Sequence, residues 1–197
     1  MTTVEPPPLN PLTGDERLLG VDATISDFWR FALPDVTTNN VRGWLAEYLV
    51  WRAIGAERPV RVEWDAFDVL WGDIRIEVKS SALVQRWAQS RDSKLAFTGL
   101  RGRVLDPSTN DYTSVATYNA DVYVLAVNLA GREKFDQLDI RQWQFAVLSR
   151  AVLEATGQSS MNWVRAQQLA TAVVGFDELA AAIRAAYDSA GTHAPIL

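Results

Sequence analysis

Residues 65–82 read DAFDVLWGDIRIEVKSSA, with two apolar runs flanking the dipeptide Gly72-Asp73. Glycine at the first position of a two-residue loop suits the type II′ turn of tight hairpins. Such a turn fixes which residues face each other across the two strands. The predicted facing pairs are Trp71 with Ile74, Val69 with Ile76, Asp68 with Glu77, Phe67 with Val78, and Ala66 with Lys79. The stretch therefore predicts a β-hairpin within the segment from about Val60 to Ser81.

This hairpin has two unlike faces, because side chains alternate along a strand. The apolar face predicts a core surface and consists of Phe67, Val69, Trp71, Ile74, Ile76 and Val78. The other face collects Asp68, Glu77 and Lys79. Opposed carboxylates, with Cβ atoms about 4.5–5.5 Å apart, repel each other unless a cation lies between them. Mg²⁺ suits this place because it prefers oxygen ligands, and Lys79 would lie beside it to orient or activate a water.

The charged face also has a plainer interpretation. An exposed strand face commonly carries Asp, Glu and Lys, and a Glu-x-Lys tripeptide arises by chance in many proteins. In that case Lys79 only screens the two acids. The hairpin alone leaves both interpretations open.

Glu47 lies in a predicted helix from Asn40 to Ile54, with Asn40 as the N-cap and Gly55 as the stop. Its neighbours three and four residues away are Gly43, Trp44, Val50 and Trp51, so the carboxylate sits beside apolar surface. A carboxylate in such a place needs an ion-pair partner, hydrogen bonds or a metal. A salt bridge to an arginine, or exposure to water at the edge of the apolar stripe, would satisfy it as well.

The remaining patterns predict a mixed α/β sandwich. The expected elements are a helix from Thr24 to Pro34 capped by Ser26 or Asp27, a helix of about three turns over residues 81–94, one short strand and a long loop in residues 95–119, a buried strand from Ala120, a strand from Trp143 to Leu148 running into a helix, and a terminal helix capped near Asp177. We expect a proline-rich flexible arm over residues 1–20, one domain over 21–190 and a tail over 191–197.

Composition narrows the chemistry. The 197 residues include no cysteine and one histidine, which excludes disulfides and thiolate metal sites and leaves oxygen-bound hard ions. Because there is no long apolar run and no signal-like start, we expect a cytoplasmic protein without a membrane span. The net charge is −5, yet residues 42–103 carry eleven Lys and Arg against eight Asp and Glu. The middle of the chain is therefore its basic part.

Four segments together resemble the PD-(D/E)XK nuclease superfamily, whose members have the restriction-endonuclease-like fold. They are RGWLAEYLV (42–50), FDV (67–69), IEVKSSA (76–82) and the predicted helix containing VQRW (84–87). Longer stretches, SDFWRFALPDVTTNNVRGWLAEYLV (26–50), ADVYVLAV (120–127) and QWQFAVL (142–148), are similar to an uncharacterised bacterial family within it. The resemblance implies a central mixed β-sheet flanked by helices in the order αβββαβ. The proline of the superfamily name is absent, since Phe67 precedes Asp68.

The resemblance also implies a metal-dependent nuclease that hydrolyses phosphodiester bonds, with a DNA endonuclease as the first expectation. Asp68 and Glu77 match the metal-binding carboxylates, and Lys79 matches the catalytic lysine. Glu47 matches a helix glutamate that binds metal directly or through water, and the carbonyl of Val78 is a further ligand. Gln85 resembles a glutamine that some members place near the site. The expected cofactor is Mg²⁺, with Mn²⁺ as a substitute.

The expected partner is nucleic acid, DNA first, and a homodimer is a further expectation because many nucleases of this fold dimerise. Candidates for phosphate contacts are Arg42, Arg86, Arg91, Lys94, Arg101 and Arg103. The main alternative is a catalytically inactive nucleic-acid-binding or scaffold subunit that keeps the fold. An enzyme of unrelated chemistry is disfavoured, because histidine, cysteine and glycine-loop motifs are missing.

Overall fold

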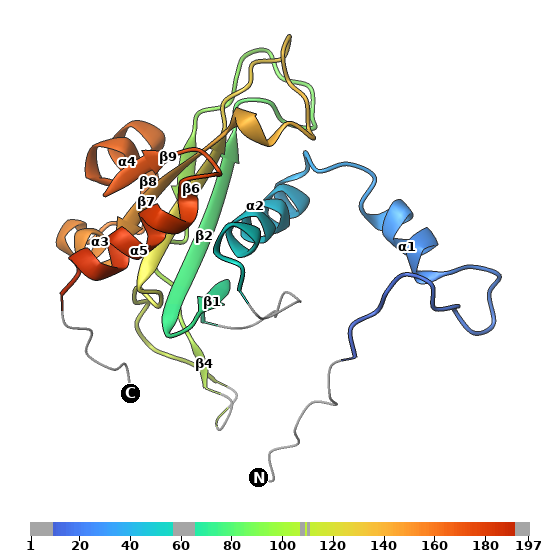
Figure 1. The fold of residues 1–197 in the computed structure, drawn as a ribbon, viewed down its shortest axis with the longest axis horizontal. Helices are drawn as coiled ribbons and strands as arrows, with labels where there is room; N and C mark the ends of the chain where they lie inside the picture. The colour runs from blue at the N-terminus through green and yellow to red at the C-terminus, as the bar shows by residue number, and fades with distance from the viewer. Residues whose placement is uncertain (1–9, 57–65, 107–108, 110, 192–197) are drawn as a thin grey trace.

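The computed structural model describes residues 10–56, 66–106, 109 and 111–191. Its centre is a five-stranded sheet with the strand order β1-β2-β6-β7-β9 (Figure 1). These strands are β1 (Val69–Trp71), β2 (Ile74–Ala82), β6 (Val122–Asn128), β7 (Trp143–Ser149) and β9 (Ala172–Val174). The β2–β6 pair is parallel and the other three pairs are antiparallel. The protein is thus an α/β protein with a mixed sheet, as the sequence predicted.

Helices cover both faces of this sheet. On one face, α2 (Asn39–Ile54) and α5 (Leu179–Ser189) pack against alternate residues of β2, β6 and β7. On the other face lie α3 (Arg150–Thr156), α4 (Trp163–Leu169) and a small ribbon formed by β3 (Ala96–Thr98) and β8 (Ser160–Asn162). Because β6 is central and covered on both sides, all seven of its residues are buried.

The helix that carries Glu47 follows its sequence pattern closely. It starts one residue earlier than expected, at Asn39 with Thr38 as N-cap, and ends at Gly55, whose φ of 61° is the left-handed conformation of a helix stop. Its residues Ala46, Leu49 and Val50 are buried against the sheet. The buried stripe therefore fixes how α2 is rotated on the sheet.

The predicted helix over residues 81–94 is wrong. β2 continues to Ala82, and Leu83 N then donates to Asn128 O, which prolongs the contact with β6. The following residues form an irregular loop closed by Gln89, which accepts from Gln85 N at 2.7 Å and donates to Leu83 O at 3.1 Å. The apolar residues have helical spacing. However, the backbone N–H and C=O groups of Leu83 and the N–H of Gln85 bond to Asn128 and to the Gln89 side chain, so they are not available for helical hydrogen bonds.

Phe67 also differs from its predicted place. It packs against the cluster that contains Tyr123 and Leu100, whereas Val69, Ile74, Ile76 and Val78 belong to the opposite core. β1 starts only at Val69, so the strict alternation of side chains does not extend back to Phe67. The prediction assumed a longer strand than the chain forms.

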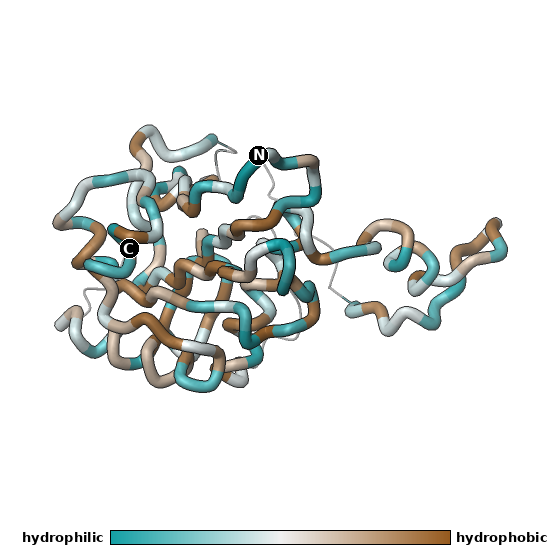
Figure 2. The backbone as a smooth tube through the Cα atoms, turned by 90° about the horizontal axis from the view of Figure 1, so that it is seen from above, coloured by the Kyte–Doolittle hydropathy of each residue, from teal (hydrophilic) through white to brown (hydrophobic). Residues whose placement is uncertain are grey.

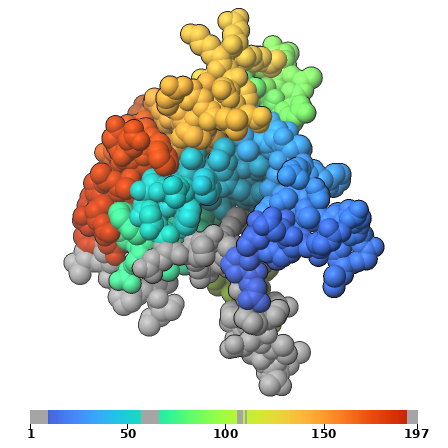
Figure 3. Space-filling model, turned by 45° about the vertical axis from the view of Figure 1, so that its right-hand side comes forward, coloured from blue at the N-terminus to red at the C-terminus, as the bar shows by residue number. Residues whose placement is uncertain are grey.

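The N-terminal part of the described chain stands away from the sheet (Figures 1 and 2). Its helix α1 (Ile25–Ala32) is capped by Thr24 in a capping box with Asp27, and not by Ser26 or Asp27 as predicted. None of its residues is buried, and Phe31 is 83% exposed. In the space-filling view the dark blue residues project from the body (Figure 3). Residues 1–9 of the expected arm lie outside the described residues.

Connections to the body begin just after α1. Asp35 Oδ2 accepts from Arg86 Nε at 3.0 Å, and Val36 N donates to Gln137 Oε1 at 3.2 Å. Residues 35 and 36 therefore fix the point at which the exposed N-terminal segment leaves the body.

The remaining elements are short. β4 (Leu105–Asp106) and β5 (Asp111–Tyr112) pair in the segment where one strand and a long loop were expected, and the 3₁₀ turn η1 (Ile140–Gln142) precedes β7. β7 runs into α3 as predicted, and α5 is preceded by Glu178 as N-cap. Among the helices of the described ranges, none is both long and apolar enough to cross a membrane.

Candidate functional site

The β1–β2 hairpin has the predicted register. Val69 faces Ile76 and Trp71 faces Ile74, and Gly72 adopts the positive φ of 58° that two-residue hairpin turns require. Asp68 comes just before β1, and its backbone N donates to Ile76 O at 3.0 Å. The Asp68 carboxylate in turn accepts from Val78 N through Oδ2 at 2.8 Å. Asp68 thus bonds both chain neighbours of Glu77 and lies across from it.

Glu77 and Lys79 form an ion pair next to Asp68. Lys79 Nζ donates to Glu77 Oε1, and only 17% of the Glu77 side chain and 28% of the Lys79 side chain are exposed. Burial raises the pKa of Glu77 to about 7, and the charges of Asp68 and Glu47 also raise it, while Lys79 opposes them. The negative charge of Glu77 is therefore costly despite its salt bridge.

Lys79 responds to the same charges in the favourable sense. Burial lowers the pKa of Lys79, but the charges of Glu77, Asp68 and Glu47 outweigh burial and hold the pKa above its ordinary value of 10.5. The surrounding charges thus favour the ionised form of Lys79 but not that of Glu77. The reason is that one cation, Lys79, lies among three carboxylates.

An oxygen donor set for a hard cation exists at this point, with Asp68 and Glu77 as its charged members. An added cation would relieve the repulsion that raises the Glu77 pKa, so the two carboxylates and a strand carbonyl such as that of Val78 fit Mg²⁺ chemically. Glu47 acts on Glu77 and Lys79 through its charge. Within the described ranges, however, no three histidine, aspartate or glutamate side chains come close enough together to hold one ion. Glu47 is thus not grouped with Asp68 and Glu77 as a direct ligand.

A cleft of about 160 Å³ opens beside the two carboxylates. Its lining comprises Ala66, Asp68, Glu77, Gly99, Leu100, Gly102, Arg103, Asn119 and Tyr123. Gly99 has a φ of 70°, and a Cβ atom built on it would lie 3.9 Å from Lys79 Cε, so the backbone passes close to the lysine stem. The carboxylates therefore face a space bounded on one side by residues 99–103.

Backbone and side-chain hydrogen bonds hold this wall in place. Gly102 and Thr117 exchange two backbone hydrogen bonds of 2.9 Å. Arg101 donates from Nε and Nη2 to Ala116 O at 3.0 and 2.7 Å and lies over the Tyr118 ring. Arg101 is thus used to position the wall, whereas the adjacent Arg103 is exposed and lines the cleft.

Arg42 and Gln85 lie together, away from the roles predicted for them. Arg42 is 6% exposed and donates to Gln85 Oε1 at 3.0 Å, to Thr37 O at 3.0 Å and to Asn39 Oδ1 at 2.5 Å. Gln85 is not on a helix, and its Nε2 donates to Ala82 O at 2.8 Å. The burial of Arg42 removes it from contact with a phosphate backbone, and the Gln85 side chain is engaged in holding Arg42.

The other predicted cations remain on the surface. Arg86 is exposed and paired with Asp35, and Arg91 and Lys94 are exposed in the loop after β2. Arg103 is the predicted cation that lines the carboxylate cleft.

Two cleft residues with polar side chains were not anticipated from the sequence. Tyr123 faces Glu77 across the parallel β2–β6 pair, and its pKa is raised chiefly by burial. Asn119 lies just before β6 and also lines the cleft. Tyr123 stands inside an apolar run that reads as core, so only the β2–β6 register, which joins distant segments, could have identified it.

Comparisons with known proteins returned nothing for this chain: no family model, no curated protein and no solved structure matches it.

Proposed function

We propose that this protein is a divalent-metal-dependent nuclease whose catalytic centre is Asp68, Glu77 and Lys79. The observation that carries the proposal is that the carboxylates of Asp68 and Glu77 line a cleft together. Burial and the charges of Asp68 and Glu47 raise the pKa of Glu77 to about 7, although Lys79 pairs with it. A purely structural ion pair has no need of the additional acids. Surplus carboxylates beside a cleft are what a site that recruits a cation requires.

The residues have separable roles in this proposal. When bound, Mg²⁺ supplies Lewis-acid polarisation of a phosphodiester and lowers the pKa of water. Asp68 and Glu77 would provide its charged ligands together with the Val78 carbonyl, and Glu47 would contribute through a water or through its charge. In the metal-free protein the carboxylates hold the pKa of Lys79 above its ordinary value, and the lysine would position the attacking water or a phosphate oxygen by hydrogen bonding, or help to deprotonate the water.

The fold gives further support. A helix bearing Glu47, a hairpin bearing Asp68 and the Glu-x-Lys tripeptide, and a parallel buried strand β6 occur in the order expected of a PD-(D/E)XK core. The missing helix after β2 is a departure from the expected αβββαβ order, and the start of the predicted hairpin segment, residues 60–65, lies outside the described residues. We include the restriction-endonuclease-like fold in the proposal on this basis.

DNA is the proposed substrate, with Mg²⁺ or Mn²⁺ as cofactor. Arg103 lines the cleft, and in this proposal it would neutralise a phosphate next to the one that is cut. Nothing in the described cleft distinguishes ribose from deoxyribose, so the assay must include RNA.

Incubation of the protein with linear, nicked and single-stranded DNA and with RNA, in Mg²⁺ or Mn²⁺, tests the proposal. Glu77→Ala and Lys79→Ala variants should lose cleavage, while Arg141→Gln should keep it, because Arg141 is exposed on η1 and pairs only locally with Asp139. If no substrate is cut in either metal, or if the two site variants cut as fast as the parent, the nuclease proposal is wrong.

One observation favours a second candidate, a nucleic-acid-binding or scaffold subunit without catalysis. Glu47 does not join Asp68 and Glu77 in a three-ligand group within the described part of the chain, and Lys79 already serves as counter-ion to Glu77. Binding of nucleic acid with no cleavage in either metal would support this candidate.

A further inference from the structure

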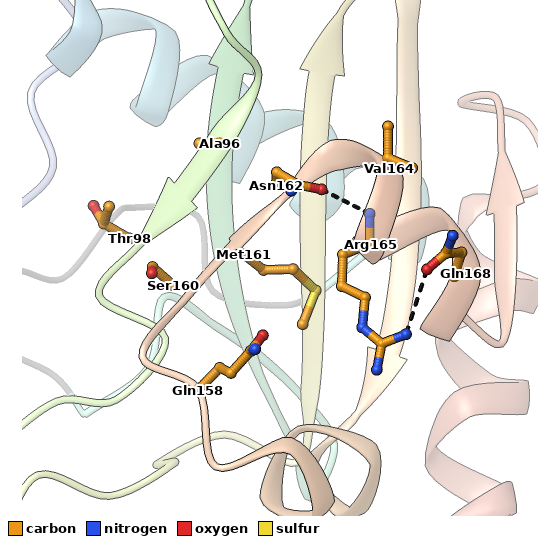
Figure 4. Close-up of a pocket in the computed structure, with 9 residues that line it drawn as sticks. All are labelled: Ala96, Thr98, Gln158, Ser160, Met161, Asn162, Val164, Arg165 and Gln168. Carbon is orange, nitrogen blue, oxygen red and sulfur yellow. Dashed lines mark hydrogen bonds between the residues drawn. The ribbon is translucent and has the colours of Figure 1, made fainter.

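A second concavity, an open groove of about 630 Å³, lies on the outer side of the β3–β8 ribbon (Figure 4). In this ribbon Ala96 faces Asn162 and Thr98 faces Ser160. The residues between them, Phe97 and Met161, are 2% and 4% exposed because their side chains belong to the core. Alternation therefore gives the groove a floor of small side chains.

The groove has a mixed lining, in which Met161 and Val164 are apolar, and no carboxylate is among its described lining residues. Three amides, Gln158, Asn162 and Gln168, surround the floor together with the guanidinium of Arg165. Asn162 Oδ1 already accepts from Arg165 N at 2.8 Å, so its NH₂ group is the end left to donate to a ligand. Arg165 Nη1 donates to Gln168 Oε1 at 3.3 Å, a neutral partner that leaves the positive charge uncompensated in the groove.

The groove and the carboxylate cleft are lined by neighbouring residues of one chain segment. Thr98 lines the groove, and the next residue, Gly99, lines the cleft. Leu100 N donates to Ser159 O at 3.0 Å, which ties the cleft wall to the segment between Gln158 and Ser160. The groove and the cleft therefore share the segment of residues 96–103, whose backbone at Gly99 passes close to Lys79.

We propose that the groove binds the part of a nucleic-acid strand that flanks the scissile phosphodiester. Arg165 binds a phosphate, and the amides of Gln158, Asn162 and Gln168 hydrogen-bond base edges, for which amide side chains carry both donors and acceptors. The small floor residues leave room for the stacked bases. The inference rests on the proposed nucleic-acid substrate but not on cleavage, because binding in the groove needs neither the carboxylates nor a metal.

Binding of a fluorescein-labelled 20-nucleotide single strand and its duplex, followed by anisotropy in EDTA over a range of salt concentrations, tests the groove. Arg165→Gln should weaken binding about fivefold and reduce the slope of log affinity against log salt by about one. Arg141→Gln is the matched control: it removes the same charge from an exposed site and should leave both quantities near those of the parent.

Base reading has a separate test. Cleavage of a random-sequence library by Gln158→Ala and Gln168→Ala variants should change the base preference at positions a fixed distance from the cut. These side chains lie at the surface, so both variants should fold.

The outcomes separate this inference from the nuclease proposal. If the parent cuts DNA but Arg165→Gln binds and cuts like Arg141→Gln, the groove inference fails and the nuclease proposal stands. If binding depends on Arg165 but no substrate is cut, the groove inference stands without the nuclease. If the parent neither binds nucleic acid in EDTA nor cuts it in Mg²⁺ or Mn²⁺, both are wrong.

Discussion

Two buried ion pairs lie on the same strand, β2, and they are built differently. Arg75 donates from its backbone N, Nε and Nη2 to the two carboxylate oxygens of Asp121, at 3.0, 2.9 and 2.6 Å. Two positions further along the charged side of β2, Lys79 donates to Glu77 while Asp68 and Glu47 act on the same two charges. In the first pair, three hydrogen bonds join one base to one acid. In the second pair, one base lies among three acids.

The difference teaches that burial of charge does not by itself mark a functional site. Hydrogen bonding to Asp121 raises the pKa of Arg75, so that pair stabilises its own ionised state. At the other pair, burial is the main cause that raises the pKa of Glu77 to about 7, and the charges of Asp68 and Glu47 add to it, so the ionised state of the acid is disfavoured. We interpret the Arg75–Asp121 pair, in which one acid and one base satisfy each other, as structural. The Lys79–Glu77 pair has additional acids beside it, and we call it the unbalanced pair because a further cation would offset their charge.

Removal of Arg75 should give the largest effect and test the structural half of this comparison. Arg75→Met removes the two side-chain hydrogen bonds and the positive charge from Asp121, whose side chain is 10% exposed, and keeps only the bond from the backbone N of residue 75; it should lower the free energy of unfolding by about 3–5 kcal/mol. Urea denaturation measures the change. A loss below about 1 kcal/mol would mean that the pair is not a structural one.

Substitution of Glu77 should separate activity from stability. Glu77→Gln removes a metal ligand, and we expect cleavage to fall about 100-fold or more, with stability at pH 8 unchanged or higher because a costly charge is gone. Asp121→Asn should do the reverse, with reduced stability but near-parental cleavage per folded molecule. Cleavage rates and urea titrations of both variants would contradict the comparison if the two variants behaved alike.

The pH dependence of the metal-free protein should show the cost of the Glu77 charge directly. The folded-state pKa of Glu77 is about 7 against an ordinary value of 4.5, so between these pH values the folded protein holds more protons than the unfolded chain. The contribution of Glu77 to stability should therefore decrease as pH rises from about 4.5 to 7, by on the order of 3 kcal/mol in total. Urea titrations in EDTA measure it by difference from Glu77→Gln, in which this decrease should be absent.

Mg²⁺ should stabilise the protein through the unbalanced pair. At ten times its dissociation constant, a ligand that binds only the folded state adds about 1.4 kcal/mol. We expect the melting temperature to rise with Mg²⁺ at pH 8, and to rise less at pH 6, where Glu77 is mostly protonated. Equal shifts in the parent and in Asp68→Asn would place the metal elsewhere.

The surface pair Arg86–Asp35 should give the smallest effect. The Arg86 side chain is 67% exposed, so Arg86→Gln should cost less than about 1 kcal/mol in a urea titration. This variant calibrates the other two pairs, because it removes a similar contact at an exposed site. A cost approaching that of Arg75→Met would show that exposure does not separate the pairs.

Local signals predicted the hairpin well. The Gly72-Asp73 turn set the register of β1 and β2, since a two-residue loop leaves little freedom to slip. The same reasoning failed at Phe67, where the strand had already ended, and after Ala82, where helical apolar spacing met a sheet edge. The spacing of apolar residues indicates which secondary structure a segment favours. Whether that structure forms depends on the tertiary contacts open to the segment.

The surroundings of the hairpin could not be predicted from the sequence. Tyr123 faces Glu77 through the parallel β2–β6 pair, and the groove residues come together in the β3–β8 ribbon, which joins residues 96–98 to 160–162. Such pairings depend on which distant strands meet. The burial of Arg42 likewise depends on the loop after β2, because Gln85 in this loop accepts a hydrogen bond from it. The sequence predicted a helix there, so this contact was not expected.

The two-residue turn at Gly72 also has a consequence for the order of folding. Asp68 and Glu77 are joined by a loop that closes in microseconds, whereas the β2–β6 pair must bring together segments more than forty residues apart. The two acids therefore meet early, while the hairpin is still in water, and their repulsion becomes costly only when β6 and the cleft wall enclose them. A divalent cation should consequently slow unfolding more than it speeds refolding when the two rates are measured with and without it. The reason is that it acts on charges that are enclosed late in folding.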